Sequence, residues 1–455
     1  MSHETVKLFS FALILLLGTS CSKDLELPEL SAGDANFTTV VAIGGDFLSG
    51  YQDGALFQEG QENSVPNLMS LQFNEIYYQT GALSARSSFK QPLMPYGLGF
   101  GFNSKKWESE FISRVALGYK VDCEGTESLS PLKNIISVSA SSAGMQYLVD
   151  GGYQNLAIPS ATIADLLDPS LSVTYADGNS NPFFGKFALN PGTSTVLNDA
   201  VLLNPTFLAL WLGMEDIYNY ASVGGYNATM LSAANFEAYL DSVLSVLTAG
   251  GAKGVIAGIP SLDDFPFYKL IPPRGLELST SKADSLNNLT GNLFGFVEGD
   301  NGFIIEDPGT SSGFDQMGDG EYILLNVPLD SMRCDFLGVF TQIPDRYVID
   351  STEAGVIRDA IKNYNDIIYT KANEYGLAFV DMNTYFASLT TGVKWNGADY
   401  STEFVSGGFI SLDGYHPNQK GYGLIANEFI KAINTKYNAT VPTTNCAGCE
   451  GVNFP

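Results

Sequence analysis

The residues best suited to chemistry lie near the C-terminus of the chain, in the turn Ser411-Leu-Asp-Gly-Tyr-His-Pro417. Asp413 and His416 are three positions apart, so the carboxylate can accept a hydrogen bond from one imidazole nitrogen. The other nitrogen then stays free to act as a general base. The sequence has two histidines, His3 and His416, and His3 precedes the expected cleavage site of an N-terminal leader. His416 is therefore the one imidazole of the mature chain, which excludes a metal site built from two histidines.

The N-terminal segment has the features of an export signal. An apolar run from Leu8 to Leu17 is about half as long as a membrane-spanning helix needs to be. The small residues Gly18-Thr-Ser20 and then Cys21 follow, which is the order of a signal peptide with its cleavage site. Cys21 resembles the lipidated cysteine of a lipobox, and a plain secretory signal is the alternative. We expect residues 1–20 to be removed. Residues 21–35 would then form a lipid-anchored tether on the outer membrane, on its periplasmic or cell-surface side.

Charge and cysteine content limit the possible partners and cofactors. The net charge is −26, with 49 acidic against 23 basic residues, so the surface repels phosphate backbones and nucleic-acid binding is not expected. Cys446 and Cys449 lie in an irregular tail, residues 437–455, where a small structural disulfide is the favoured interpretation. A zinc site would need four converging ligands, and we expect no cofactor. The pairing of Cys123 and Cys334 stays open.

The pattern of apolar runs predicts an α/β fold. Amphipathic stretches separate short runs that are typical of buried strands, and the clearest helix spans Ser351 to Tyr375, with Ser351 as N-cap and Gly376 as its end. Strands that alternate with helices indicate a three-layer sandwich with a mainly parallel sheet, and ligands bind beyond the carboxyl ends of such strands. Residues 85–135 and 265–345 are interpreted as long insertions around the site. The expected strands are Phe37–Ile43, Leu156–Ile158, Phe207–Leu212, Gly254–Ile259, Tyr322–Val327 and Leu377–Val380.

Four segments, taken in order, resemble the sequence blocks of SGNH/GDSL hydrolases. Asp413-Gly-Tyr-His-Pro417 is similar to the last block, and Ala42–Phe57 lies where the family has Gly-Asp/Asn-Ser-Leu. Asn155–Ala161 resembles the second block, whose glycine amide binds the oxyanion, and Trp211–Asp216 resembles the third, whose asparagine does the same. The resemblance covers residues 36–436. It implies a flavodoxin-like SGNH hydrolase fold and hydrolysis of acyl esters of lipids or glycans.

The departures from this family pattern fall on the catalytic positions. The serine position holds Asp46, a shift of one residue would place Phe47 there, and Ser49 fits only after a longer shift. The glycine of the second block is Ser160, whose amide can still donate if its dihedral angles suit a side chain. The asparagine of the third block is Glu215, and an ionised carboxylate donates no hydrogen bond. Loss of one oxyanion donor typically costs about 100–1,000-fold in rate.

Three interpretations of this altered site stay open. The first is a repurposed hydrolase scaffold, a pseudoenzyme that binds a small-molecule, glycan or lipid ester ligand without turnover. The second is a working hydrolase in which Asp46 is the nucleophile, or a base for water with His416 as its partner. The third is a metal site of Asp46, Glu215 and His416. All three require these residues, with Ser160 and Asp413, to meet at the carboxyl edge of the sheet. Their proximity would raise the pKa of one carboxylate and that of the imidazole.

Overall fold

The computed structural model describes most of the chain that follows the expected leader and tether. Cys21 and the signal peptide lie outside the described residues, so the predictions about export concern a part of the chain without structural description. Within the described ranges, no helix is both long enough and apolar enough to cross a membrane. The described residues are 29–94, 99–101, 110–133, 135–137, 147–148, 152–173 and 181–455.

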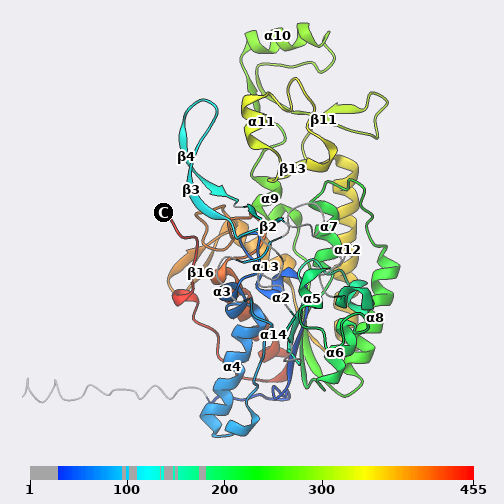
Figure 1. Ribbon diagram of the computed structural model, residues 1–455, viewed down its shortest axis with the longest axis vertical. Coiled ribbons are helices and arrows are strands. Elements are labelled where there is room, and N and C mark those ends of the chain that lie inside the picture. The colour runs from blue at the N-terminus through cyan, green and yellow to red at the C-terminus, as the bar shows by residue number, and fades with distance from the viewer. Residues whose placement is uncertain are drawn as a thin grey trace, which may run out of the picture.

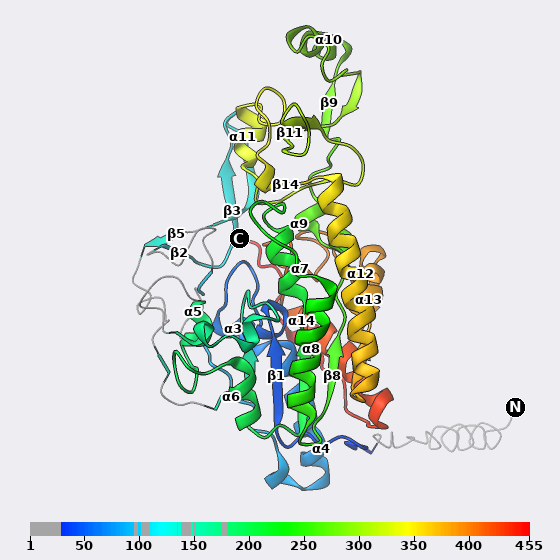
Figure 2. The same ribbon diagram turned by 90° about the vertical axis from the view of Figure 1, so that its right-hand side faces the viewer.

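A five-stranded sheet, parallel in every pairing, lies at the centre of the molecule (Figure 2). The predicted α/β class with a parallel sheet is confirmed. With these strands counted along the chain, their spatial order is 2-1-3-4-5, the flavodoxin-like arrangement of doubly wound folds. In that order the strands are β6 (Asn155–Ala157), β1 (Val40–Gly44), β7 (Phe207–Trp211), β8 (Lys253–Ala257) and β15 (Ala378–Val380).

The register of the sheet places the carboxyl ends of its strands level with one another. Gly44, the last residue of β1, pairs with both Ala157 and Trp211, which end the two neighbouring strands. Trp211 pairs with Ala257, and Ala257 with Val380, so the alignment continues to the outer strand. Every residue of β1 and β7 is buried, because helices cover both faces of the sheet. Residues that directly follow these strands therefore lie along one edge.

Helices pack on the two faces of the sheet (Figure 1). On one face α4 (Val65–Thr80) contacts α14 (Gln419–Tyr437), and on the other α8 (Ala233–Thr248) contacts α12 (Ser351–Glu374). This arrangement is the predicted three-layer sandwich. The other elements of this domain are α2 (Asp46–Ser49), α3 (Gln58–Glu62), α5 (Pro182–Gly185), α6 (Val196–Leu202), α7 (Met214–Ala221), α13 (Met382–Thr391), β2 (Glu110–Ile112), β5 (Ile135–Ser137), β16 (Val393–Trp395) and β17 (Ala398–Tyr400).

Helix α12 agrees with the sequence in its buried stripe and differs at its start. The predicted apolar positions from Ile357 to Ala372 are buried, and Gly376, with a φ of +69°, follows its end. The N-cap is Asp350 and not Ser351, because Asp350 accepts the N–H of Glu353 at 2.8 Å. The Glu353 side chain in turn accepts the N–H of Asp350 at 3.0 Å. This reciprocal capping box satisfies two amides that would otherwise have no partner in the helix.

Residues 266–345 form a projecting lobe beyond the carboxyl edge of the sheet (Figures 1 and 2). The lobe contains two small hydrophobic clusters separate from the main core, one around Ile323 and one around Leu286. The expected sheet strand Tyr322–Val327 is wrong, since only Tyr322 and Ile323 are extended and they pair with β14 outside the central sheet. Elements of this region are α9 (Pro266–Lys269), β9 (Leu276–Leu278), α10 (Thr280–Leu289), β10 (Gly299–Asn301), β11 (Ile304–Glu306), β12 (Phe314–Gln316), β13 (Tyr322–Ile323), α11 (Leu329–Cys334) and β14 (Val348–Ile349).

A hairpin of β3 (Ala116–Val121) and β4 (Glu127–Leu132) is fastened to the lobe by a disulfide. Cys123, in the turn of the hairpin, is joined to Cys334 at the end of α11, with their Cα atoms 6.2 Å apart. Arg333 reinforces this contact, because its guanidinium forms an ion pair with Asp122 at 2.5 Å and another with Glu124 at 2.8 Å. Cys123 and Cys334, whose pairing the sequence left open, thus form a disulfide across 211 positions of the chain.

The expected disulfide between Cys446 and Cys449 is not formed, and both thiols are free. Cys446 is buried against α14, where a Cβ on Gly423 would lie 2.6 Å from its sulfur. Asn427 of the same helix places its amide nitrogen 3.7 Å from this sulfur. The thiol of Cys446 therefore packs into the helix, while Cys449 is partly exposed. Close spacing in the chain did not determine the pairing.

Alkylation of the unfolded but unreduced chain is expected to label Cys446 and Cys449 and to leave Cys123 and Cys334 unlabelled. Peptide mapping by mass spectrometry measures this directly, and reduction before alkylation provides the control in which every one of these cysteines is labelled. A cross-linked peptide that joins Cys446 to Cys449 would contradict the assignment.

Candidate active site

The five site residues predicted from the sequence meet at the carboxyl edge of the sheet. Asp46 follows β1, Ser160 follows β6, and Glu215 lies in the first turn of α7 after β7. Asp413 and His416 lie in the loop before α14 and contact this edge. The predicted convergence is confirmed by these contacts. The site occupies the switch point of the sheet, between the strands on either side of β1, where ligands bind in doubly wound folds.

His416 is held between two carboxylates. Its Nδ1 lies 2.9 Å from Oδ2 of Asp413, and its Nε2 lies 3.1 Å from Oδ2 of Asp46. The second oxygen of Asp46, Oδ1, accepts the backbone N–H of Ser160 at 2.9 Å. The Asp46 carboxylate therefore bridges the imidazole and the amide after β6. The side chains of Asp46 and His416 are 2% and 3% exposed, so this bridge is shielded from water.

The loop that carries His416 is fixed against the turn that follows α2. Gly54 donates its N–H to Oδ2 of Asp413 at 2.8 Å, and Asp53 donates its N–H to Oγ of Ser411 at 3.0 Å. Leu412 returns a hydrogen bond to Oδ1 of Asp53 at 3.0 Å. Both Asp53 and Gly54 have positive φ values, 54° and 72°, which turn the chain sharply enough to present these amides. The loop that carries Asp413 and His416 is thus positioned by hydrogen bonds from backbone amides as well as by the charge pairing of His416.

The charges of the site keep His416 protonated. Burial lowers the pKa of the imidazole, but the carboxylates of Asp413 and Asp46 outweigh it and raise the pKa to about 10. Burial also raises the pKa of Asp413, but His416 and the hydrogen bonds that Asp413 accepts outweigh it and hold its pKa below the ordinary value. The raised pKa favours the protonated imidazole at neutral pH. In that form both ring nitrogens donate, and no lone pair is free to act as a general base.

Glu215 differs from the sequence expectation in its protonation. Burial and the neighbouring Asp46 carboxylate raise the pKa of Glu215 well above its ordinary value, so the neutral acid is favoured over the ionised form. Its Oε1 accepts the backbone N–H of Asp46 at 3.0 Å, and its Oε2 has no hydrogen-bond partner among the described residues. The close approach depends on Gly45, where a Cβ would lie 2.3 Å from Oε1 of Glu215. A neutral Glu215 has one O–H donor, which the sequence argument had denied it.

Ser160 occupies a conformation that favours glycine. Its φ of +61° lies in the left-handed region, which costs a residue with a Cβ on the order of 1 kcal/mol. This conformation presents its N–H to Oδ1 of Asp46, and Asn219 steadies the turn by donating to the Ser160 carbonyl at 3.2 Å. The amide expected at this position is therefore present, but it already has an acceptor within the protein.

Four aromatic rings enclose the imidazole, and of these the sequence singled out Phe47 alone, in another role. The ring centroids of Tyr415, Tyr51, Phe47 and Tyr218 lie 4.9, 5.0, 5.5 and 6.0 Å from that of His416. Tyr415 also stacks on Tyr218 at 4.1 Å. The one available signal was position, since Tyr415 precedes the histidine and Tyr51 lies in the segment of Asp46. These rings exclude water and strengthen the charge pairing.

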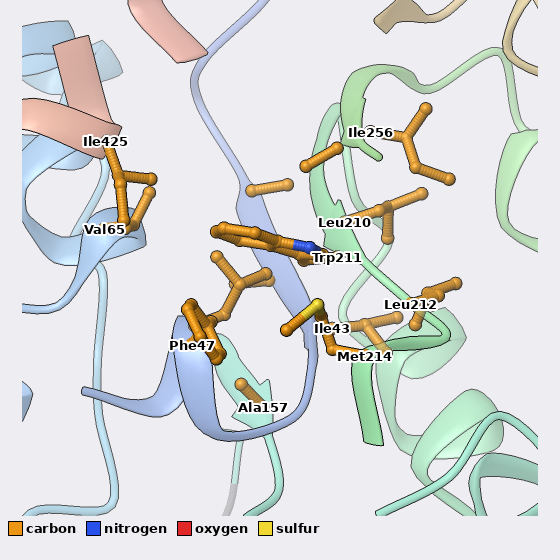
Figure 3. Close-up of a cluster of buried hydrophobic side chains, with 14 of the residues drawn as sticks. Ile43, Phe47, Val65, Ala157, Leu210, Trp211, Leu212, Met214, Ile256 and Ile425 are labelled. Atoms are coloured by element: carbon orange, nitrogen blue, oxygen red, sulfur yellow. The ribbon is translucent and has the colours of Figure 1, made fainter. Parts of the chain in front are cut away.

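Phe47 belongs to a cluster of buried hydrophobic side chains (Figure 3). Its ring lies 5.0 Å from that of Trp211 in β7, in the buried cluster that also contains Ile43 and Met214. The alternative register, with Phe47 at the serine position, is therefore wrong. Ser49 is no nearer to the chemistry, since its hydroxyl donates to the Asp46 carbonyl at 2.9 Å. Asp46 is the side chain that faces the imidazole.

The structure does not favour the metal interpretation. Among the described residues, no group of three or more His, Cys, Asp and Glu side chains is arranged to hold a metal ion. Both oxygens of Asp46 and one of Glu215 instead accept hydrogen bonds from nitrogens of the protein. These oxygens satisfy protein donors, so a cation would have to break the existing contacts.

Comparisons with known proteins leave the family undetermined. No protein-family model and no curated protein matches the chain. One solved structure that is similar is that of LAE5, described as an alpha/beta hydrolase enzyme from the metagenome of Lake Arreo, Spain. It is 11% identical, with 87% of this chain and 94% of that chain covered, at a TM-score of 0.35. A likeness at this level carries no argument about function. What defines the class is the structure itself, a doubly wound α/β protein with a buried aspartate–histidine–aspartate bridge.

The imidazole of His416 is expected to titrate near pH 10 in the folded protein. Because the folded pKa lies above the unfolded value of about 6.5, the bridge stabilises the fold fully below about pH 6.5 and loses this contribution as pH rises through 10. NMR of the histidine ring in the mature chain measures the titration, and Asp46→Asn should shift its midpoint downwards. A midpoint near 6.5 in the unaltered protein would contradict the charge assignment.

Proposed function

We propose that this chain is an exported SGNH/GDSL hydrolase-like lipoprotein whose catalytic site no longer hydrolyses esters and which acts as a binding protein. The 2-1-3-4-5 sheet supports the scaffold, because it places the three family-like blocks after β1, β6 and β7 at one edge. The contact of the Asp413–His416 pair with Asp46 supports descent from a hydrolase site. The leader, with Cys21 as the lipidated residue, supports the location.

The observation that carries the proposal is the position of the Asp46 carboxylate. In a serine hydrolase the nucleophilic oxygen faces the imidazole, and the oxyanion of the substrate faces backbone amides. Here Oδ2 of Asp46 lies at the first position, 3.1 Å from Nε2 of His416. Its Oδ1 lies at the second, 2.9 Å from the amide nitrogen of Ser160. One side chain of the protein therefore occupies the places of both nucleophile and oxyanion.

The amides of Ser160 and Asp46 and the imidazole of His416 are also unavailable to a substrate, because each already has a hydrogen-bond partner within the protein. The N–H of Ser160 donates to Asp46, and the N–H of Asp46 donates to Glu215, so both candidate oxyanion donors are satisfied within the protein. His416 is hydrogen-bonded to a carboxylate on each side, and its raised pKa favours the protonated form, which cannot remove a proton from a nucleophile. A substrate carbonyl would have to displace two buried carboxylates before any chemistry began.

A nucleophilic role for Asp46 is less consistent with this geometry. Attack by an aspartate on an ester would form a reactive anhydride, and the attacking oxygen would first have to leave His416. Both carboxylate oxygens accept hydrogen bonds from buried donors, which lowers their nucleophilicity. We therefore do not propose the working-hydrolase interpretation.

Aryl esters of graded acyl chain length test the proposal directly. We expect the unaltered protein and His416→Ala to hydrolyse them at the same background rate, because His416 supplies no base. Release of the aryl alcohol, followed by absorbance, measures the rate. Hydrolysis by the unaltered protein that His416→Ala abolishes would refute the loss of catalysis.

The double substitution Asp46→Ser with Glu215→Asn tests the hydrolase ancestry. It replaces the bridging carboxylate by a hydroxyl, supplies an amide donor and leaves Asp413 and His416 in place. We expect esterase activity about 100-fold or more above the parent, on the scale of one restored oxyanion donor. The same pair with His416→Ala is the matched control. A folded double variant, checked by circular dichroism, that stays as inactive as its control would count against the hydrolase scaffold.

Lipid anchoring through Cys21 is expected to be lost in Cys21→Ser. The protein should then appear in the soluble fraction or retain its leader, while the unaltered chain partitions with the membrane. Fractionation and the intact mass of the protein distinguish these outcomes. Unchanged membrane partition of Cys21→Ser would rule out this anchor.

A further inference from the structure

A groove of about 520 Å³ opens on the surface next to β8 and β15, and none of its lining residues belongs to the His416 site. One wall is a face of α12 that includes Arg358, Lys362 and Tyr369, and the other is the start of α13. The volume falls within the range of about 300–1,000 Å³ typical of small-molecule sites. Because the groove follows the carboxyl ends of two strands, it lies at the edge where such folds bind ligands.

The floor of the groove is held rigid by side-chain amides. Asn365 accepts the N–H of Ile259 at 2.7 Å and donates to the carbonyl of the same residue at 2.9 Å. Asn383 donates to this carbonyl from the opposite wall at 3.2 Å. A Cβ on Gly258 would lie 2.9 Å from Oδ1 of Asn365 and 3.3 Å from the ring of Phe379, so glycine permits this close packing. A floor fixed in this way loses little entropy when a ligand binds.

Tyr369 supplies a flat apolar surface in the groove. Its side chain is 55% exposed, although large aromatic residues elsewhere on the sheet domain are mostly buried. The ring contacts Phe379 edge-on, with centroids 5.3 Å apart and planes at 80°. The Phe379 contact positions the tyrosine ring, and the exposed part of the ring can pack against a ligand.

The charges in the groove select a neutral ligand. Of the charged residues that line the groove, Lys362 is paired with Asp366 at 2.7 Å, and Asp381 balances the charge of Arg358, so the groove has no excess of positive charge to hold a phosphate or a carboxylate. The net charge of −26 opposes anions in general. A wholly apolar ligand would leave the polar groups along both walls without partners. What remains is an uncharged molecule with both a flat apolar face and many hydroxyl groups.

We propose that this groove binds a neutral saccharide unit, with one face of the sugar ring stacked on Tyr369. Asp366 accepts hydrogen bonds from its hydroxyls, and Arg358 and the side-chain amide of Asn383 complete the polar contacts. This site goes beyond the proposed function, since it does not depend on the state of the His416 site. It gives the binding protein a ligand class and a location for it.

Isothermal titration calorimetry of the mature chain tests the proposal with glucose, galactose, mannose and N-acetylglucosamine and with disaccharides of each. We expect at least one of these probes to bind. Tyr369→Ala should weaken its Kd by about tenfold through the loss of stacking. Tyr369→Phe keeps the ring and should bind within about twofold of the unaltered protein. Val356→Ala is the matched control, because Val356 is exposed on α12 and does not line the groove.

Three results would overturn the saccharide site. These are no binding of any probe, binding that Tyr369→Ala leaves unchanged, and binding that Val356→Ala weakens equally. Titrations with inorganic phosphate and with octanoate cover the other ligand classes, and a Tyr369-dependent signal from either of them in place of a sugar would also refute it. Ester hydrolysis that depends on His416 would overturn the proposed loss of catalysis and leave this site untouched, so the two failures are distinguishable.

Discussion

A positive charge on a buried imidazole has to be balanced where it is buried, and the bridge from Asp413 through His416 to Asp46 provides that balance. Charged groups removed from water are costly unless opposite charges and hydrogen bonds replace the solvent. Asp46 lies in the turn after β1 and His416 in the loop before α14, 370 positions apart in the chain. The bridge therefore requires that the loop before α14 docks against the turns that follow β1.

The charge balance at His416 also constrains Glu215. This side chain lies beside the Asp46 carboxylate, which already accepts hydrogen bonds from His416 and from the Ser160 amide. Two neighbouring ionised carboxylates would repel each other in a medium of low dielectric constant, and together with burial this raises the pKa of Glu215 and favours its neutral form. A neutral carboxylic acid, like a carboxamide, presents both an acceptor and a donor. A neutral Glu215 thus offers a donor, as the asparagine that the resemblance implies would, but on a side chain longer by one methylene, and Gly45 provides the space for it.

The sequence predicted the sheet, its parallel strands and the meeting of the five site residues, because apolar runs and level strand ends follow from local pattern and topology. It did not predict the role of the Tyr322 segment, since a short apolar run does not reveal whether its partner is the central sheet or a lobe. The link from Cys123 to Cys334 depends on how two insertions pack, which spacing does not report. The protonation of Glu215 depends on burial and on the distance to Asp46, and neither quantity is visible in a list of residues.

The disulfide between the hairpin and α11 has a consequence for the response of the chain to proteolysis. It spans 211 positions of chain, which include most of the projecting lobe and its exposed helix α10. A protease that cuts the lobe at α10 would leave Asp46 on one fragment and His416 on the other. The fragments would stay covalently joined, with four strands of the sheet in the first and β15 with α14 in the second. A nicked molecule therefore remains a single particle with its central sheet and its buried bridge in place.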